Sequence, residues 1–394
     1  MSLSQKLSSP MRMFGKGLSV RQSITVEETN ALDRDGCIQR ISHSRVFRKD
    51  VGSLPLKNLG PDSVPKTITF DAFTEVKHIC DGSNSNLFTC NWEGREVIVK
   101  RLKVEKIIVP HVLSEFEFES EFLRRAKDCP QLVKIWGYGF DLISEWDLPE
   151  DVPFDPESQL SVTNDKGRHI QMPFVVLEAL KGGSLGFFLN KRRNYHKLPF
   201  SIGRVLSIMR QLAEALTYIH EGFHKDYCII HRDLKPDNIV FDDHNNLRVI
   251  DFGLSTCVAR GTGGVDAAPM TGGTGSLRYM SPEVAKSTPY NDRTDMYSFG
   301  IIAYEVLTGV APYGSMNKAK FFERVIEKKE RPDVNIDDYG RRIHAPKAAK
   351  DLISRCWDDN YTKRPSASEA LAVCWELEKE QALVDAQQRG CSCS

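Results

Sequence analysis

The spacing of apolar residues predicts a strand-rich region that begins near Thr67. Short runs of apolar and β-branched residues, separated by brief polar connections, are typical of β-strands. These runs occupy residues 70–80, 86–92, 96–102, 132–138 and 173–178. One segment, 113–127, instead has the charged amphipathic pattern of a helix. The first part of the chain should therefore form a small lobe of strands with one helix.

The second half of the chain has the spacing of helices. Six apolar residues recur at intervals of one, three and four, which places them on one helix face. They are Val205, Ile208, Met209, Leu212, Leu216 and Ile219. A second apolar helix is predicted at 294–307, and Ser366 with Glu369 forms a capping box for a last helix. The fold class is thus α+β, a strand-rich lobe followed by a larger helical lobe.

The N-terminal segment is expected to lie outside the folded part. Residues 1–60 hold ten Lys or Arg and five Asp or Glu, a surplus of +5, with poor hydrophobic periodicity. We predict that residues 1–65 form a basic, largely disordered region. The acid-free start, up to Val26, also has the composition of an organelle transit peptide, which is the alternative to a solvated arm.

An internal segment and the C-terminus also lack a clear period. Residues 141–170 hold eight Asp or Glu and two Lys or Arg, a net charge of −6, and predict a long acidic loop. This loop is either a solvated insert or a surface that recruits basic partners. Residues 379–394 are predicted to form a tail. Cys391 is fourth from the end, as in a prenylation box, but Cys393 is not aliphatic, which favours a free polar tail.

The overall composition excludes several classes of protein. Across 394 residues, 53 Lys or Arg balance 53 Asp or Glu, so a bulk nucleic-acid binder is not expected. No apolar run reaches the roughly 18 residues of a membrane-spanning helix. The ten cysteines include no CxxC pair, which favours reduced thiols over a zinc site. A cytoplasmic protein is expected, with a nuclear or organelle location as the alternatives.

Four motifs carry the chemical signal. The densest is the octet His231-Arg232-Asp233-Leu234-Lys235-Pro236-Asp237-Asn238. The others are Val97-Ile98-Val99-Lys100 upstream and, downstream, Asp251-Phe252-Gly253 and Ser281-Pro282-Glu283. In this order they resemble the protein kinase family, Ser/Thr type, and the stretch 271–280 resembles its tyrosine-kinase-like group. The resemblance implies a bilobal domain at 66–378, with an N-lobe at 66–178 and a C-lobe at 181–378.

The resemblance implies phosphoryl transfer from ATP, with Mg²⁺ as cofactor, to protein substrates. In the family, the Asp of the DFG motif and the Asn of the catalytic loop hold the metal; these roles fall on Asp251 and Asn238, whose oxygens suit Mg²⁺. Asp233 corresponds to the residue that accepts the proton of the substrate hydroxyl. Lys235 corresponds to the lysine that contacts the γ-phosphate.

Lys100 corresponds to the lysine that pairs with the α- and β-phosphates, and it needs an acidic partner from the helix that follows. Glu119 fits best, while Glu117 and Glu121 are the alternatives. An apolar slot should hold the adenine. By resemblance its residues are Ile79, Leu87, Ile98 and Val240, the gatekeeper Leu177, and the backbone of Glu178 and Leu180 at the adenine edge. All of these aliphatic residues are alternatively ordinary core.

The glycine-rich loop departs from the family. The pattern Gly-x-Gly-x-x-Gly-x-Val reads here Cys80-Asp81-Gly82-Ser83-Asn84-Ser85-Asn86-Leu87, so only Gly82 remains. Glycines in such a loop let the backbone come close to phosphates. Their loss, together with the negative charge of Asp81, predicts a weaker affinity for ATP and retained activity.

The activation segment extends from Asp251 to Glu283. Thr271 and Thr274 are the expected phosphorylation sites, with Arg232 as the partner of the phosphate. An upstream activating kinase is therefore a candidate partner. Ser276 takes the place where Ser/Thr kinases have a Thr that bonds the catalytic Asp and Lys.

Two scaffold roles also follow from the resemblance. Glu283 should form a buried ion pair with Arg364, and Asp295 should anchor the catalytic loop from below.

Three rival functions stay open. A pseudokinase scaffold is supported by the degraded glycine-rich loop. A tyrosine or dual-specificity kinase is disfavoured by Lys235 and Ser276. A small-molecule kinase of related fold is disfavoured by the long activation segment. The function predicted from the sequence is a protein serine/threonine kinase that uses Mg-ATP.

Overall fold

The computed structural model describes residues 67–391, except 108, 150–151, 153–159, 165–166, 195–199, 262–263, 315 and 336–343. The predicted N-terminal region at 1–65 lies outside the described residues, as do residues 392–394 with Cys393. The first described residue, Thr67, begins the first strand, where the apolar pattern also begins.

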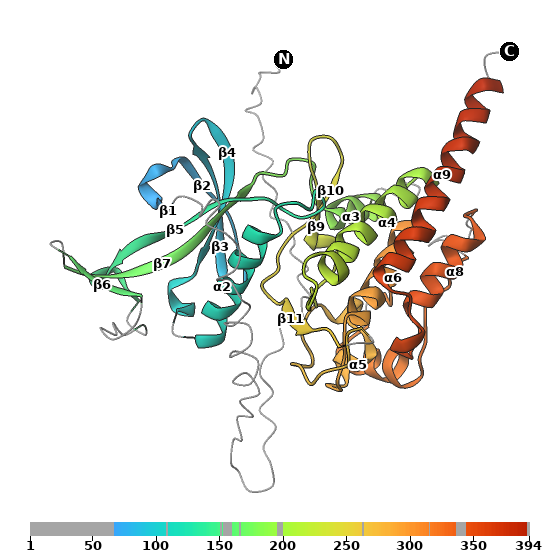
Figure 1. The fold of residues 1–394 in the computed structure, drawn as a ribbon. Coiled ribbons are helices and arrows are strands. Elements are labelled where there is room, and N and C mark those ends of the chain that lie inside the picture. Colours follow the sequence, from blue (N-terminus) through green and yellow to red (C-terminus); the bar gives the residue numbers. More distant parts are fainter. Residues whose placement is uncertain are drawn as a thin grey trace, which may run out of the picture. The chain divides into compact units, whose positions relative to one another are not determined.

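A seven-stranded sheet forms the N-lobe (Figure 1). Its strands are β1 (Thr67–Thr69), β2 (Thr74–Asp81), β3 (Ser85–Trp92), β4 (Arg95–Leu102), β5 (Ile135–Ser144), β6 (Ser161–Asn164) and β7 (Gly167–Glu178). The strand order is β1-β5-β7-β4-β3-β2, with β6 paired to β7. All pairs are antiparallel except β1 with β5. The first predicted strand starts later than expected, because Phe70–Ala72 form a 3₁₀ turn.

The two faces of this sheet have different surroundings. Val97 and Val99 of β4 pack with Phe174 and Val176 of β7 in a core cluster that belongs to the N-lobe alone. Successive side chains of a strand point to opposite faces. Lys100 therefore lies on the other face of β4, toward the C-lobe.

One helix, α2 (Pro110–Arg125), completes the N-lobe and packs against β5 (Figure 1). Pro110 stands at the first helical position, where its missing N–H costs nothing. The buried side chains of α2 recur every three to four residues, as on one helix face. They are Val112, Phe116, Glu119, Phe122 and Leu123. A carboxylate is thus carried into an otherwise apolar interface.

The predicted acidic loop at 141–170 is wrong over most of its described residues. Strand β5 continues to Ser144, β7 begins at Gly167, and β6 pairs with the outer part of β7. The hairpin is held by burial of Ile170, which is 4% exposed, and by an ion pair between Arg101 and Asp141. The strand pattern was hidden because the added strands are short and largely polar: β6 reads Ser-Val-Thr-Asn, and β7 begins Gly-Arg-His.

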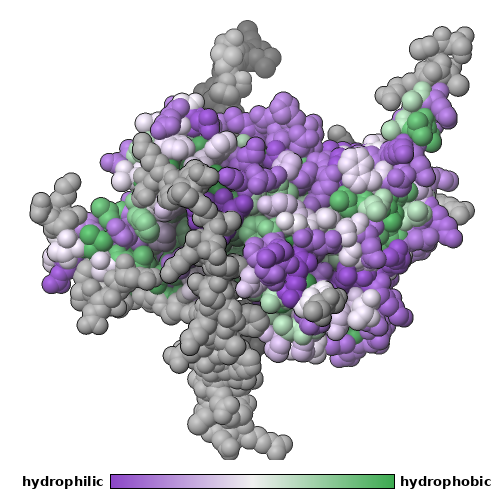
Figure 2. Space-filling view, viewed as in Figure 1, coloured by the Kyte–Doolittle hydropathy of each residue, from purple (hydrophilic) through white to green (hydrophobic). Residues whose placement is uncertain are grey.

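The far end of this hairpin leaves apolar side chains exposed. Hydrophobic colour gathers there on the face shown in Figure 2. Trp146, in the turn after β5, is 85% exposed, and Leu142 of β5 is 48% exposed.

Helices make up most of the C-lobe (Figure 1). They are α3 (Leu185–Asn194), α4 (Ile202–Thr217), α5 (Pro282–Ala285), α6 (Arg293–Thr308), α7 (Lys318–Phe321), α8 (Lys347–Cys356) and α9 (Ala367–Cys391). Short π-helical turns follow α4 and α7, at Tyr218–Gly222 and Phe322–Glu327. Two small sheets pair β8 (Tyr227–Ile230) with β11 (Thr256–Ala259), and β9 (Ile239–Phe241) with β10 (Leu247–Val249).

The predicted helices of the C-lobe are confirmed. Five of the six apolar residues that predicted α4 are buried within it, and the sixth, Ile219, is buried in the turn that follows. Helix α6 is buried on all sides, from Thr294 to Thr308, as expected for a central helix that other elements surround.

The last helix begins at its predicted cap and extends further than expected. The Ser366 Oγ accepts the N–H of Glu369 at 3.1 Å, while Glu369 Oε2 accepts the N–H of Ser366 at 2.7 Å. The tail predicted from residue 379 is helical as far as Cys391. Contact with α4 contributes to this extension, because Gln381 and Asp385 lie beside Gly203 at the start of α4.

The ion pair expected between Glu283 and Arg364 is present and buried. The guanidinium donates from Nη1 to Oε1 at 2.5 Å and from Nη2 to Oε2 at 2.8 Å. Arg364 is 2% exposed and also donates to the carbonyl oxygens of Asp358 and Arg293. The pair joins the end of the activation segment to the segment before α9.

We expect the substitution Arg364→Ala to lower the free energy of unfolding by about 3–5 kcal/mol, because it leaves the Glu283 carboxylate buried without its counter-charge. Urea unfolding followed by circular dichroism measures the change. The control Arg324→Ala breaks an exposed pair with Glu330 and should cost less than about 1 kcal/mol. Equal losses in the two variants would contradict the assignment.

Candidate active site

Three charged side chains from three separate elements meet between the lobes. Lys100 of β4 donates from Nζ to both oxygens of Glu119 of α2, at 2.9 and 2.7 Å. The same Nζ lies 3.0 Å from Oδ1 of Asp251, which follows β10. The backbone N–H of Phe252 also donates to Glu119, at 3.2 Å. Side chains 19 and 151 residues away from Lys100 are thereby joined through one ammonium group.

The alternatives to Glu119 are placed elsewhere. Glu117 is exposed on the outer face of α2. Glu121 accepts hydrogen bonds from Arg124 and Arg125, the two basic residues at the end of the helix. Of the three acids considered from the sequence, the structure places only Glu119 against Lys100.

The charges of this cluster stabilise one another. Burial by itself would lower the pKa of Lys100, but the carboxylates of Asp251 and Glu119 outweigh it and raise that pKa above its ordinary value. The Lys100 ammonium in turn lowers the pKa of Asp251 to about 2. Burial raises the pKa of Glu119, and Lys100 acts in the opposite direction. Lys100 and Asp251 are therefore both charged at neutral pH.

The octet forms a loop whose polar groups converge on Asp233. Lys235 Nζ lies 2.6 Å from Oδ2 of Asp233, and the backbone N–H of Ser276 donates to Oδ1 at 2.8 Å. Asn238 Nδ2 donates to the Asp233 carbonyl at 2.9 Å, which leaves Oδ1 as the acceptor atom of that amide. The Asp233 carboxylate, 8% exposed, is thus oriented from two sides.

A buried carboxylate holds this loop from below. Asp295 of α6 accepts the N–H of His231 at 2.8 Å and the N–H of Arg232 at 2.9 Å. The ring of His220 lies 2.9 Å from the same carboxylate. Arg232 has a φ of 67°, a conformation that costs a residue with a side chain about 1–3 kcal/mol. The bonds to Asp295 keep the loop in this shape.

An aromatic stack that the sequence analysis did not identify links α2 to the loop. The rings of Phe122 and Phe252 are 4.7 Å apart, and those of Phe252 and His231 are also 4.7 Å apart. The stack fixes Phe252, and hence the backbone of the neighbouring Asp251, against both lobes.

The residues predicted to hold adenine lie beside this cluster. Leu87 is paired with Lys100 and Ile98 with Leu177 across neighbouring strands. Leu87, Ile98, Leu180 and Val240 are half-buried, Leu177 is buried, and Ile79 is 48% exposed. Ser184 bridges to Val240, which brings the C-lobe side of the slot close to the segment after β7. Most of the predicted lining is therefore partly accessible rather than sealed in the core.

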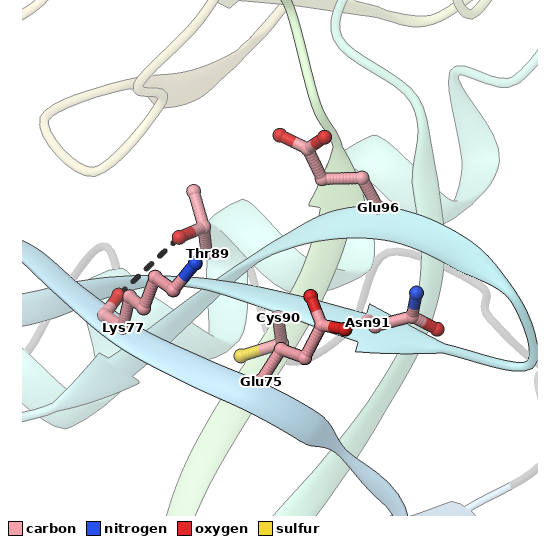
Figure 3. A pocket seen from close by; sticks show the side chains of 6 residues that line it. All are labelled: Glu75, Lys77, Thr89, Cys90, Asn91 and Glu96. Carbon is pink, nitrogen blue, oxygen red and sulfur yellow. Dashed lines mark hydrogen bonds between the residues drawn. The ribbon is translucent and has the colours of Figure 1, made fainter.

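A polar recess of about 180 Å³ continues the same sheet face toward the strand ends (Figure 3). Its lining residues are Glu75, Lys77, Thr89, Cys90, Asn91 and Glu96. Thr89 lies opposite both Lys77 and Ile98, so the recess adjoins the slot. The six residues include none of those predicted to handle the nucleotide.

The comparisons with known proteins agree with this geometry. The family model described as "protein kinase domain" matches residues 73–375. The chain belongs to the protein kinase family. Within the described part of this kinase chain, no helix has both the length and the apolar character needed to cross a membrane.

Relatives of the kinase domain are known from plants and animals. Serine/threonine-protein kinase STY46 of Arabidopsis thaliana is 33% identical over 52% of this chain, and serine/threonine/tyrosine-protein kinase HT1 of the same plant is 33% identical over 50%. Mitogen-activated protein kinase kinase kinase 7 of Drosophila melanogaster is 32% identical over 53%. These matches span 32%, 46% and 28% of the relatives' own lengths, so the similarity concerns the kinase domain. This similarity agrees with the assignment of the kinase domain to the tyrosine-kinase-like group.

The glycine-rich loop of this kinase is a tight turn between β2 and β3. The N–H of Gly82 donates to the Ser85 carbonyl at 2.8 Å, and a Cβ at Gly82 would lie 3.0 Å from that oxygen. Asp81 contacts the ring of His78 at 2.9 Å. The weaker affinity for ATP stays a prediction.

The activation segment of the kinase packs closely on the catalytic loop. Arg232 Nη1 donates to Thr271 Oγ1 at 3.0 Å, whereas the Thr274 hydroxyl donates to the carbonyl of Thr271 at 3.1 Å. Gly275 has a φ of +93°, and a Cβ there would lie 2.4 Å from the Arg232 carbonyl. Glycine at this position thus permits the contact between Ser276 and the loop; the sequence analysis did not single it out.

The two residues predicted to hold a metal, Asp251 and Asn238, supply part of the ligand set that a metal ion needs. Among the residues with described positions, no group of three or more His, Cys, Asp or Glu side chains is arranged to hold a metal. Asp251 and Asn238 offer one carboxylate and one amide, and the N–H of Ile250 donates to the Asn238 carbonyl at 3.0 Å, which keeps them close. Mg²⁺ is usually bound by one or two such groups together with phosphate oxygens. The pair therefore suits a metal that arrives with a nucleotide.

Replacing Lys100 with Met should raise the pKa of Asp251 from about 2 toward its ordinary value of 3.8, because the cation that lowers it most is lost. In the wild type, the stabilisation from this carboxylate is complete above pH 3.8 and is lost as the pH falls toward 2. Nuclear magnetic resonance of the labelled carboxyl carbon, titrated down to the onset of acid unfolding, measures the difference. Lys77→Met is the control and should leave the curve unchanged. A titration of Asp251 that is identical in wild type and Lys100→Met would refute the coupling.

Proposed function

We propose that this chain is a protein serine/threonine kinase that transfers the γ-phosphate of Mg-ATP to hydroxyl groups of protein substrates. The observation that carries the proposal is the joint arrangement of two groups. One is the cluster of Lys100, Glu119 and Asp251 between the lobes, and the other is Asp233 held between Lys235 and Ser276. Membership of the kinase family supports the reaction class.

Each residue has a distinct part in this proposal. Mg²⁺, when bound with ATP, neutralises phosphate charge. Lys100, held in place by Glu119, supplies a fixed positive charge for the phosphates, and Lys235 supplies a second one near the acceptor. Asp233 orients the substrate hydroxyl and accepts its proton through the carboxylate that Ser276 and Lys235 position. Positioning and charge account for most of the catalysis of phosphoryl transfer.

Serine or threonine is the acceptor that the site favours. Lys235 lies beside Asp233, in the family position where tyrosine kinases have another sequence, and Ser276 contacts the same carboxylate through its backbone N–H. Relatives are named serine/threonine kinases, among them STY46, which supports this choice. A dual-specificity activity is the second candidate, because one relative is named a serine/threonine/tyrosine kinase.

The variant Asp233→Asn should lower the rate of phosphate transfer by about 10²–10⁴-fold, because the amide cannot accept the hydroxyl proton. Transfer of radiolabelled phosphate from ATP to a general protein substrate, followed by phosphoamino-acid analysis, measures it. The control Asp226→Asn changes an exposed acid away from the site and should retain full activity. Absence of transfer by the wild type would favour a scaffold, and phosphotyrosine in the product would favour dual or tyrosine specificity.

Phosphorylation of the activation segment is the regulation we propose. Thr271 is the better of the two predicted sites, because its hydroxyl is exposed and already contacts Arg232. A phosphate there would replace one neutral hydrogen bond with charge-assisted bonds to the guanidinium. Thr274 instead donates to backbone carbonyls and is half-buried.

Replacing Thr271 and Thr274 together with Ala should lower the activity of the phosphorylated kinase by about tenfold, the worth of a charge-assisted hydrogen bond. Thr271→Ala alone should account for most of the loss. Rates before and after phosphatase treatment measure the effect, with Thr274→Ala as the matched control. Unchanged activity of the double variant would remove phosphorylation at these sites from the proposal.

The partners and the location of the protein are proposals as well. Protein substrates and an upstream activating kinase follow from the proposed activity, and the kinase cascade implied by the name of one relative is consistent with both. We also propose a cytoplasmic location, on the composition of the sequence alone.

A further inference from the structure

Arg248 is a buried charged residue in strand β10, three positions before Asp251. Its side chain is 11% exposed and lies between two carboxylates. Nη2 donates to Oδ2 of Asp242 at 3.0 Å, and Nε lies 3.4 Å from Oε1 of Glu178. The guanidinium also donates to the carbonyl of Leu247 at 3.2 Å. One side chain therefore contacts two segments that are far apart in the chain.

The first of these segments is the end of β7, where Glu178 is firmly held. Oε1 of Glu178 accepts the N–H of Lys134 at 2.9 Å, and the N–H of Glu178 donates to the carbonyl of Lys134 at 2.9 Å. The Glu178 side chain is 15% exposed. Glu178 and Leu180 provide the backbone proposed to meet the adenine edge.

The second segment is the turn between β9 and β10. Asp242 accepts the N–H groups of His244 and Asn246 at 2.9 and 2.8 Å. Burial would raise the pKa of Asp242, but these bonds and the charge of Arg248 lower it, so the carboxylate stays charged. This turn returns the chain into β10 and then to Asp251.

Strand β10 is itself connected to the site. The N–H of Val249 donates to the carbonyl of Gln131 at 2.7 Å, and the N–H of Ile250 donates to the carbonyl of Asn238 at 3.0 Å. Strands β7 and β10 do not pair with each other. The backbone of residues 131–134 joins them indirectly, because the N–H of Glu178 donates to the Lys134 carbonyl and the N–H of Val133 donates to the Val249 carbonyl. The side chain of Arg248 supplies a direct connection between them.

We infer that Arg248 is a positioning residue for the nucleotide, an inference that rests on the proposed kinase function. It sets the distance between the backbone at Glu178, which would hold the base, and Asp251, which would face the phosphates and the metal. The guanidinium donates a hydrogen bond to Asp242, and its Nε, which makes no hydrogen bond, places positive charge 3.4 Å from Glu178. A lysine ammonium would offer the two carboxylates only a point charge. Losing the connection misaligns the two ends of the nucleotide site without changing any group that would touch the reacting atoms.

The test compares Arg248→Met and Arg248→Lys in the full chain. The dissociation constant of Mg-ATP, measured by titration calorimetry, and the KM for ATP should rise by roughly 3- to 30-fold in Arg248→Met. The KM for the protein substrate should change little. Arg248→Lys should recover part of the affinity, which also keeps the inference testable if Arg248→Met does not fold.

The matched control is Arg210→Met, which removes a half-buried arginine that bridges Glu214 of α4 and Glu378 of α9, away from the cleft. It should lower the melting temperature and leave the affinity for Mg-ATP unchanged. A purely structural role of Arg248 would give the same result in Arg248→Met, with lower stability and unchanged affinity, and would overturn the inference.

A double variant tests the named contact. In Arg248→Met combined with Glu178→Gln, the loss of affinity should be smaller than the product of the two single losses, because both act on one interaction. Fully multiplicative losses would count against the contact with Glu178. Failure of the wild type itself to bind Mg-ATP would overturn the proposed kinase function and this inference with it, a result that is distinct from a change confined to the variants.

Discussion

The ammonium group of Lys100 is the point on which the arrangement of the two lobes depends. It holds one carboxylate from α2 and one from the segment after β10. Burial makes its attraction to Glu119, whose side chain is 3% exposed, stronger than it would be in water. A different element places each of the three side chains. The register of β4 in the sheet places Lys100, the packing of α2 on β5 places Glu119, and strand β10 of the C-lobe leads to Asp251. An error in any of these three packings would leave a charged group in the interior without its partner. The cluster therefore ties the correct assembly of the lobes to the presence of a complete site.

The C-lobe stabilises the reactive loop through buried polar groups rather than through the loop's own conformation. Arg232 and Asp251 both have left-handed backbone angles, with φ of 67° and 64°. Such angles persist only where the surroundings impose them. Asp295 supplies this constraint by accepting two backbone N–H groups, and it is itself carried by α6, which is buried on every side. A helix that is buried on every side is thus placed beneath a loop that holds left-handed backbone angles.

Buried arginines connect segments that no regular hydrogen-bond ladder joins. Arg364 binds Glu283 and two backbone carbonyls, and so holds the end of the activation segment. Arg248 lies between Asp242, to which it donates a hydrogen bond, and Glu178, which it contacts through charge alone. A guanidinium suits these places because its donors spread in a plane and its charge never titrates in proteins. Exposed pairs such as Arg324 with Glu330 have no comparable effect, since water already solvates both charges.

The sequence alone determined those parts of the protein that depend on local pattern or on a spacing shared with a family. The period of α4 and the cap of α9 each lie within a few residues, and the motifs follow one another along the chain, so the bilobal fold and the candidate site residues could be predicted from them. The extension of the hairpin of β5 and β7 could not, because its outer strands are short and largely polar and show no clear alternation. Nor could the sequence choose firmly among three acids of α2: only the direction in which each side chain leaves the packed helix separates Glu119 from Glu117 and Glu121.

Gly275 and Arg248 carried no local signal at all, since their roles arise from segments that the tertiary structure brings to within about 3 Å of them. The residue types in the sequence determine which chemical groups are available, but contacts between distant residues form only when the elements pack.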